Sequence, residues 1–288
     1  MRFQLIDKQR SRYKISMLCA ILDVSRSGYY AWKKRKPSQR EETNQALLEH
    51  ICRIHKLSRK AYGSPRMHFQ LRKEGLIYKR KRVARLMHLA GLQGRRKGRR
   101  MVTTDSRHTF PIAPNHLNRD FTAARPNQKW VADITYIPTQ EGWLYLAGVM
   151  DLFSRKIVGW NMSGQLDTSL VENALRMAFY QRQPDQGLLH HSDRGCQYAS
   201  TTIRTLLADH RVNVSMSGKG NCYDNAVMES FWGTLKNEWV HHQKYLTRAQ
   251  ARTDIFGYIE GFYNTVRLHS SLGYLSPVEF EAINKFHS

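Results

Sequence analysis

Residues 130–137 read WVADITYI, a run of apolar and β-branched side chains with one acid, Asp133, near its middle. Alternation of this kind predicts a half-buried β-strand. A turn at 138–142 follows, and then two more apolar runs, 143–151 (WLYLAGVMD) and 156–160 (KIVGW). Runs joined by such short loops predict three antiparallel strands.

Beyond residue 160 the pattern alternates between helix and strand. Helical periodicity is found over four stretches, at 168–182, 200–209, 225–240 and 247–265. Short strands are expected at 188–191 and 212–216. Three strands followed by alternating helices and strands predict an α/β fold with a mixed five-stranded sheet flanked by helices.

Three carboxylates stand at positions where a purely structural acid is unexpected. Asp133 lies among apolar neighbours in a strand, where an unpaired charge costs several kcal/mol. Asp193 directly follows a strand, and Glu229 lies in the apolar helical segment AVMESFW. Taken singly, Asp193 is compatible with a cap or loop residue and Glu229 with a surface residue. Together they can converge on one point.

Three converging carboxylates suggest a metal-dependent phosphoryl transfer. Two divalent cations held by such acids activate one oxygen and stabilise the leaving oxygen of an in-line displacement. A ligand set of oxygen alone favours Mg²⁺ or Mn²⁺ over zinc. The histidines His190 and His191 are not expected to bind one zinc ion, because neighbouring strand residues point to opposite faces.

The positive charge of the chain is concentrated in its first third. The net charge is +23, and residues 1–100 hold 28 Lys and Arg against 6 Asp and Glu, a net of +22. Residues 101–288 hold 18 basic and 17 acidic side chains. A polyanion is therefore the expected partner, and nucleic acid is the commonest. A membrane surface would require a broad exposed apolar helix face, which is lacking here.

The basic third is expected to be helical. Residues 13–35 predict two short helices with Ser25 as the N-cap of the second. Ser64 and Pro65 predict the start of a further helix, with Ser64 as its N-cap and Pro65 as its first residue. Residues 79–90 are a candidate recognition helix of a helix-turn-helix. Its outer face carries the basic residues Lys81, Arg82 and Arg85. For residues 13–35, a small helical hairpin with a solvated basic end fits the same pattern.

A basic run ends this region. Its members are Arg95, Arg96, Lys97, Arg99 and Arg100. These side chains are suited to binding phosphates rather than bases, and a solvated charged surface is the alternative. The predicted domains are 1–38 and 39–100, both helix-turn-helix-like, a connector at 101–128, and a catalytic core at 129–288.

Several long motifs resemble one known family. They are WVADITY (130–136), HHSDRGCQY (190–198), GNCYDNAVMESFWGTLKNE (220–238) and YNTVRLHSSLGYLSP (263–277), with VSRSGYYAW at 24–32. They resemble the integrase-core transposases of bacterial insertion sequences. The chain is most similar to the second-frame proteins of insertion-sequence family three, over nearly its whole length.

The resemblance implies a function and a set of residues. It implies an RNase H-like core with an Asp-Asp-Glu triad at Asp133, Asp193 and Glu229, and a contact between Lys236 and the end of the element. Such an enzyme binds terminal inverted repeats, cleaves there, and uses the freed 3′-OH to attack another phosphodiester, including the opposite end of the same strand to give a circle. Asn225, one helical turn before Glu229, either faces the scissile phosphate or caps the helix.

The expected partners follow from this function. They are double-stranded DNA at the element ends and at the target, further copies of the chain on DNA, and an upstream-frame protein with a helix-turn-helix and a leucine zipper, as a fusion or a separate chain. No signal peptide or run of 18 apolar residues is found, so we expect a bacterial cytoplasmic protein. Two alternatives remain open at this stage, an RNase H-like nuclease without strand transfer and a non-enzymatic DNA-binding regulator.

Overall fold

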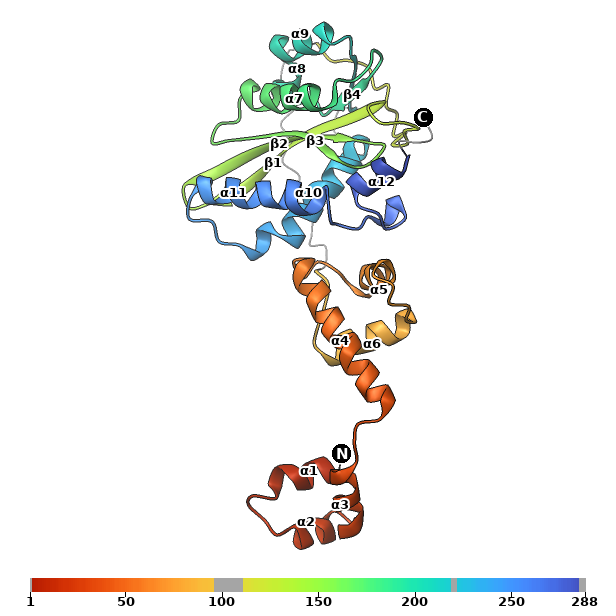
Figure 1. The fold of residues 1–288 in the computed structure, drawn as a ribbon. Coiled ribbons are helices and arrows are strands. Elements are labelled where there is room, and N and C mark those ends of the chain that lie inside the picture. Colours follow the sequence, from red (N-terminus) through yellow and green to blue (C-terminus); the bar gives the residue numbers. More distant parts are fainter. Residues whose placement is uncertain (1, 96–110, 219–221, 285–288) are drawn as a thin grey trace. The chain divides into compact units, whose positions relative to one another are not determined.

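The computed structural model describes residues 2–95, 111–218 and 222–284 (Figure 1). The described residues group into two compact units, Met1–Ile51 and Cys52–Ser288. Helix α4 (Gln39–Leu57) begins in the first and ends in the second. No helix among the described residues has both the length and the apolarity needed to cross a membrane.

The first unit begins with a small helical cluster. Its helices are α1 (Arg2–Gln9), α2 (Ile15–Ile21) and α3 (Arg26–Lys34). They pack around the buried side chains of Ile6, Cys19 and Tyr29. Ser25 accepts a hydrogen bond from the backbone N–H of Gly28 and so caps α3, as predicted. Helix α1 was not expected from the sequence.

Two further basic helices open the second unit. They are α5 (Ser64–Lys73) and α6 (Arg80–Leu89), which pack on each other through Met67, Leu71, Val83, Leu86 and Met87. The prediction that Ser64 caps α5 is wrong, because the cap position is Gly63 and Ser64 is already helical. The predicted recognition helix over 79–90 corresponds to α6.

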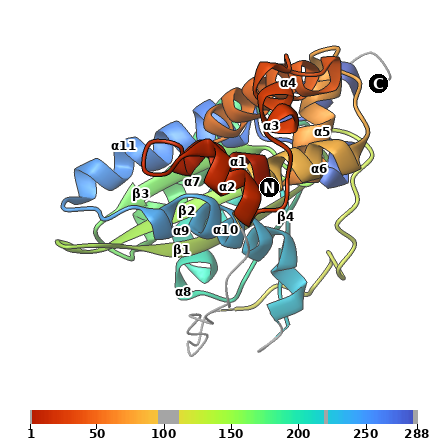
Figure 2. The ribbon, with the colours of Figure 1, turned by 90° about the horizontal axis from the view of Figure 1, so that it is seen from below.

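The core contains the expected five-stranded mixed sheet. Its strands are β1 (Lys129–Thr139), β2 (Gly142–Asp151), β3 (Ile157–Ser163), β4 (Leu189–Ser192) and β5 (Asn213–Met216). Their order is β3-β2-β1-β4-β5, with β1, β2 and β3 antiparallel and β4 and β5 parallel to β1. Figure 2 shows β3, β2 and β1 side by side in this order. Strand β1 is therefore central, with a hairpin partner on one side and β4 on the other.

Helices cover the sheet on both faces, and Figure 1 shows them as separate layers. One layer contains α7 (Thr168–Arg182), α8 (Cys196–Ala199) and α9 (Thr201–Asp209), and it shares a core with Trp130 and Ala132 of β1. Gly159 of β3 lets α7 approach closely, because a Cβ there would lie 2.2 Å from the carbonyl oxygen of Ala174.

The other face of the sheet is covered by the C-terminal helices. They are α10 (Ala226–Glu238) and α11 (Arg248–Tyr258), which contact β1, and α12 (Pro277–Asn284) follows them. The predicted helix over 247–265 is continued beyond α11 by a π-helical turn, Ile259–Tyr263. Since β1 residues alternate between the faces, Asp133 points toward α10, whereas Trp130 and Ala132 point toward α7.

A buried ion-pair network connects α5 to α10 and to the C-terminal segment. Arg267 forms a two-pronged pair with Glu238 of α10, with both N–O distances at 2.7 Å. Arg66 of α5 lies 3.4 Å from the same carboxylate and donates to the carbonyl oxygen of Leu268 at 2.9 Å. The Tyr62 hydroxyl accepts from the Leu268 N–H at 3.0 Å. The end of α10 is therefore bonded both to α5 and to the C-terminal segment.

Candidate active site

Asp133 is held in the middle of β1 by two hydrogen bonds. Its Oδ1 accepts from the backbone N–H of Ile134 at 2.8 Å, and its Oδ2 accepts from the Trp232 indole N–H at 3.1 Å. Burial and the negative charge of Asp193 raise the pKa of Asp133 well above its ordinary value, and Glu229 adds to this rise. The two hydrogen bonds act in the opposite direction. Asp193 and Glu229 therefore each lie within electrostatic range of Asp133.

Asp193 is brought to Asp133 by strand pairing. The parallel register between β1 and β4 pairs Trp130 with His190 and Val131 with His191, so Asp193 follows β4 at the level of Asp133. Its Oδ1 accepts from the Gly195 N–H at 3.0 Å, which fixes the turn after the strand.

The histidines of β4 support this strand from inside the protein. His191 is held between the Ser215 hydroxyl at 2.8 Å and the Ser217 hydroxyl at 3.1 Å, on the β5 side. His190 is buried near the Tyr198 ring on the other face. Burial lowers the pKa of His190 to about 3 and that of His191 to about 4, so both are neutral at physiological pH. The two rings lie on opposite faces, as predicted, and both pack within the fold.

Glu229 comes from the first turn of α10, which packs on β1. Asn225 occupies the position before this helix, is 5% exposed, and donates from Nδ2 to the carbonyl oxygen of Ala132 at 3.0 Å. Its side chain makes no capping bond. Asn225 thus attaches the start of α10 to β1 beside Asp133, a role that the sequence did not indicate.

Lys236 lies two helical turns after Glu229 on the same helix. It is half-buried, and burial lowers the pKa of its ammonium group while the charge of Asp133 acts against this. The structure therefore brings Lys236 within electrostatic range of Asp133.

The donor set is suited to a hard cation, although the described side chains do not form a closed metal site. No group of three or more His, Cys, Asp or Glu side chains within the described ranges has the spacing of a metal site. The candidate ligands are nevertheless all carboxylates, and their repulsion raises the pKa of Asp133. A bound cation would relieve this repulsion, and oxygen ligands favour Mg²⁺ or Mn²⁺.

The predicted DNA-binding residues lie in different surroundings. Lys81 and Arg85 are exposed on α6, and Arg82 lies with its guanidinium 4.9 Å from the Tyr78 ring. Arg95 donates to the carbonyl oxygen of Glu238, and its guanidinium lies 5.7 Å from the Trp239 ring. The remaining members of the basic run fall outside the described residues: Arg96, Lys97, Arg99 and Arg100.

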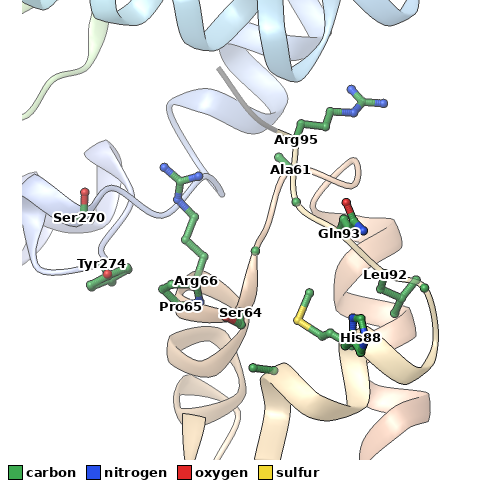
Figure 3. Close-up of a pocket in the computed structure, with 15 residues that line it drawn as sticks. Ala61, Ser64, Pro65, Arg66, His88, Leu92, Gln93, Arg95, Ser270 and Tyr274 are labelled. Atoms are coloured by element: carbon green, nitrogen blue, oxygen red, sulfur yellow. The ribbon is translucent and has the colours of Figure 1, made fainter. Parts of the chain in front are cut away.

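A cavity of about 590 Å³ lies between the helices α5 and α6 and the C-terminal segment (Figure 3). Arg66, Arg95 and His88 line it from the helical region, and Ser270 and Tyr274 line it from the C-terminal segment. None of the three acids borders it. The candidate active site on β1, β4 and α10 is therefore distinct from this cavity.

Family models match most of the chain. Residues 123–222 and 210–277 each match a model described as an integrase core domain, and residues 42–100 match a model described as an HTH-like domain. Together these matches cover the proposed acids and the basic helices.

Curated relatives extend along almost the entire sequence. The chain is 45% identical over 270 residues to the insertion element IS600 uncharacterized 31 kDa protein of Shigella sonnei, covering 94% of this chain and 98% of that one. It is 39% identical over 286 residues to the transposase InsF for insertion sequence IS3A of Escherichia coli strain K12, covering 99% of each.

Two solved structures align with parts of the chain. A chain of the simian T-cell lymphotropic virus intasome in complex with PP2A regulatory subunit B56 gamma aligns with a TM-score of 0.48 at 13% identity, covering 80% of this chain and 74% of that one. The HTLV-2 integrase catalytic core domain in complex with magnesium, in its dimeric form, aligns with a TM-score of 0.42 at 15% identity, covering 55% and 98%.

Proposed function

Because the chain belongs to the IS3 family of insertion-sequence transposases, with an integrase core and an HTH-like domain, we propose that it binds the ends of its element and catalyses DNA cleavage and strand transfer there. One observation above all supports this proposal. The charges of Asp193 and Glu229, which come from a strand end and a helix, both act on Asp133 in the central strand. Two acids from separate elements thus act electrostatically on the third, which supports a shared catalytic role.

We assign the catalytic carboxylates to Asp133, Asp193 and Glu229. They would hold two Mg²⁺ or Mn²⁺ ions, which when bound would lower the barrier by activating the attacking oxygen and stabilising the leaving one. The protein itself holds Asp133 through Ile134 and Trp232 and fixes Asp193 through Gly195. These bonds place the acids before DNA arrives, so less ordering is needed in the complex.

The proposed reaction requires no covalent protein–DNA intermediate, because water and then a 3′-OH are the nucleophiles. A water oxygen attacks phosphorus at the end of the element, and the bond from phosphorus to the 3′ oxygen breaks, leaving a 3′-OH and a 5′-phosphate. That 3′-OH then attacks a second phosphodiester, one P–O bond forms as another breaks, and the displaced 3′ oxygen takes up the proton. Lys236, which lies within electrostatic range of Asp133, would contact the DNA of the end as a positive point charge.

We assign DNA binding mainly to the regions before the core. Residues 1–38 and 39–100 would act as helix-turn-helix-like modules, 101–128 as a connector, and 129–288 as the catalytic core. Helix α6 would enter the major groove with Lys81, Arg82 and Arg85, and the basic run from Arg95 to Arg100 would contact phosphates. Asn225 would act near the scissile phosphate through its attachment of α10 to β1.

The chain would work in the bacterial cytoplasm as an oligomer on DNA. Two ends of one element must be held together for strand transfer, and a second copy supplies the second site most simply. An upstream-frame protein with a leucine zipper, fused or separate, would assist this pairing. Target DNA would be the second nucleic acid.

Strand joining is the experiment that tests the proposed function. The full chain is incubated with labelled element-end DNA, target DNA and Mg²⁺ or Mn²⁺, beside a scrambled end of equal length. We expect cleaved and joined products on the cognate end only. Cuts without any joined product would identify a nuclease, and binding without either product would identify a regulator; both results would contradict the proposal.

A further inference from the structure

The indole of Trp232 reaches from α10 to the central acid of β1. Trp232 lies three residues after Glu229, so the two side chains project from the same side of the helix. Its ring is 6% exposed, and its N–H points to Oδ2 of Asp133 at 3.1 Å. An indole nitrogen can only donate a hydrogen bond and a carboxylate can only accept one, so the direction of this bond is fixed.

The carboxylate of Asp133 is thereby held at both oxygens. The Ile134 N–H binds Oδ1 at 2.8 Å, and the indole N–H binds Oδ2. Two donors on opposite oxygens fix the rotation of the carboxylate plane. Each oxygen keeps a second lone pair, which can bind a cation.

Gly148 makes room for the indole. It lies opposite Asp133 in the β1–β2 register. A Cβ at Gly148 would lie 2.8 Å from Cη2 of Trp232, closer than carbon atoms can approach without one of them moving. Glycine weakens the interior of a strand and often marks a close approach of another group. Here the group that approaches is the ring that holds Asp133.

We propose that Trp232 is a positioning residue of the active site, and that its indole N–H, seated over Gly148, holds the Asp133 carboxylate in the orientation that binds a divalent cation. This inference rests on the proposed function. The side chain itself touches no substrate. It acts through Asp133, as hydrogen-bond donors behind metal ligands commonly do, and their loss typically lowers metal affinity 10–100-fold.

The first test follows the indole N–H directly. Full-length protein labelled with ¹⁵N in its tryptophans gives one indole signal per ring, and the signal missing in Trp232→Phe is that of Trp232. We expect Asp133→Asn to shift this signal, and Mg²⁺ to shift it in the wild type. The Trp160 signal, from an indole that donates to Glu260 at 2.7 Å elsewhere, serves as the reference and stays unchanged.

The second test measures cation binding without DNA. Mn²⁺ affinity is followed by electron paramagnetic resonance for wild type, Trp232→Phe and Gly148→Ala. Phenylalanine keeps most of the ring and removes only the donor, and we expect about tenfold weaker Mn²⁺ binding. Alanine at 148 must displace the indole and should weaken binding similarly. The matched control, Trp160→Phe, removes an indole–carboxylate bond outside the site and should bind Mn²⁺ as the wild type does.

The outcomes separate this inference from the proposed function. If Asp133→Asn loses Mn²⁺ binding while Trp232→Phe binds Mn²⁺ as tightly as wild type, Trp232 has no positioning role and the proposed function stands. If Asp133→Asn itself binds Mn²⁺ normally, the metal assignment fails. If Trp232→Phe melts at a markedly lower temperature, the indole spectrum of Asp133→Asn tests the inference instead, because that variant keeps Trp232. An unshifted Trp232 signal in that spectrum would overturn the inference.

Discussion

At the scale of single residues, the active site depends on charges that the fold forces together. The charges of Asp193 and Glu229 oppose ionisation of Asp133, whereas the N–H groups of Ile134 and Trp232 favour it. Such an arrangement costs stability in the free protein and is therefore expected where function requires it. The neighbouring Lys236 is half-buried and is the cation of α10 that acts on Asp133.

Lys236→Ala should impair recognition of the element's end more than it impairs chemistry. Lys236 lies about 10 Å along the helix from Glu229, so it can reach DNA beside the scissile phosphate but is too distant to act as a ligand of the same ion. We expect a larger loss of cleavage on cognate ends than of joining by pre-cleaved ends. Lys244→Ala, at an exposed loop position, is the control. Equal losses on cognate, scrambled and pre-cleaved ends would mean that Lys236 does not read the end.

His190 should make the fold sensitive to acid. Its pKa is lowered to about 3 by burial and then by His191, and neither ring nitrogen has a hydrogen-bond partner among the described residues. Below pH 6.5 the unfolded chain therefore binds a proton that the folded chain does not, so stability falls as the pH falls toward the folded pKa. For His190 this amounts to about 2 kcal/mol at pH 5.

The measurement is urea unfolding at pH 7 and pH 5. In His190→Leu the loss of unfolding free energy between these pH values should be smaller than in wild type by about 2 kcal/mol. His88→Gln, at an exposed position of α6, should leave the loss unchanged. An identical loss in His190→Leu and wild type would show that His190 is not the source.

At the scale of elements, α10 has two separate tasks. Its first half places Glu229 and Trp232 against β1, and its last residue, Glu238, is buried in the pair with Arg267. Arg66 of α5 shares this carboxylate. The helix that carries Glu229 is thus anchored at its far end by α5 and by Arg267.

Removing Arg267 should destabilise the second unit strongly. Arg267→Met removes the closest ion-pair partner of Glu238 and leaves Arg66 at 3.4 Å. Breaking a buried pair typically costs about 3–5 kcal/mol. The double variant with Glu238→Gln should recover part of this loss in chemical denaturation. Lys73→Ala, which breaks a half-exposed pair with Glu279, should cost less than about 1 kcal/mol. A loss for Arg267→Met as small as that control would contradict the role of the network.

The elements were largely predictable from the sequence, because their patterns are local. Helices α6 and α7 follow from apolar periodicity, and β1 follows from its alternating residues. Short or irregular elements, such as α8 and the π-helical turn after α11, carry no such pattern. The grouping of the acids was expected, but the contacts that hold them were not: the bond from Trp232 to Asp133, the room left by Gly148, and the attachment of Asn225 to Ala132 depend on packing between segments far apart in the sequence.

At the scale of the whole molecule, charge and chemistry are divided along the chain. The first third carries nearly the entire net charge, and the acids lie in the core. Helices α1 to α3 have their own buried cluster at Ile6, Cys19 and Tyr29, whereas α5 is bonded to the C-terminal segment through Tyr62 and Arg66. The first 38 residues are therefore the part that can be removed with least disturbance to the core.

Deleting residues 1–38 should weaken DNA binding and flatten its dependence on salt. The segment holds 10 Lys and Arg against 2 Asp, and each phosphate contact that is lost reduces the slope of log affinity against log salt by about 0.9. Binding of end DNA is measured by fluorescence anisotropy from low to physiological salt. Mn²⁺ affinity, which depends on the core, should not change. A slope equal to that of the full chain would show that this segment makes no phosphate contacts.

The most direct test of the account is Asp133→Asn in the full chain on labelled element-end DNA, with cleavage and binding measured under one condition. Asparagine removes a proposed metal ligand and one negative charge near phosphate. We predict that cleavage and joining fall by about 10³ or more, while DNA affinity is unchanged or higher. Asp209→Asn, an exposed acid at the end of α9, should behave as wild type. Cleavage by Asp133→Asn at even about a tenth of the wild-type rate would contradict the assignment of Asp133 as a catalytic metal ligand.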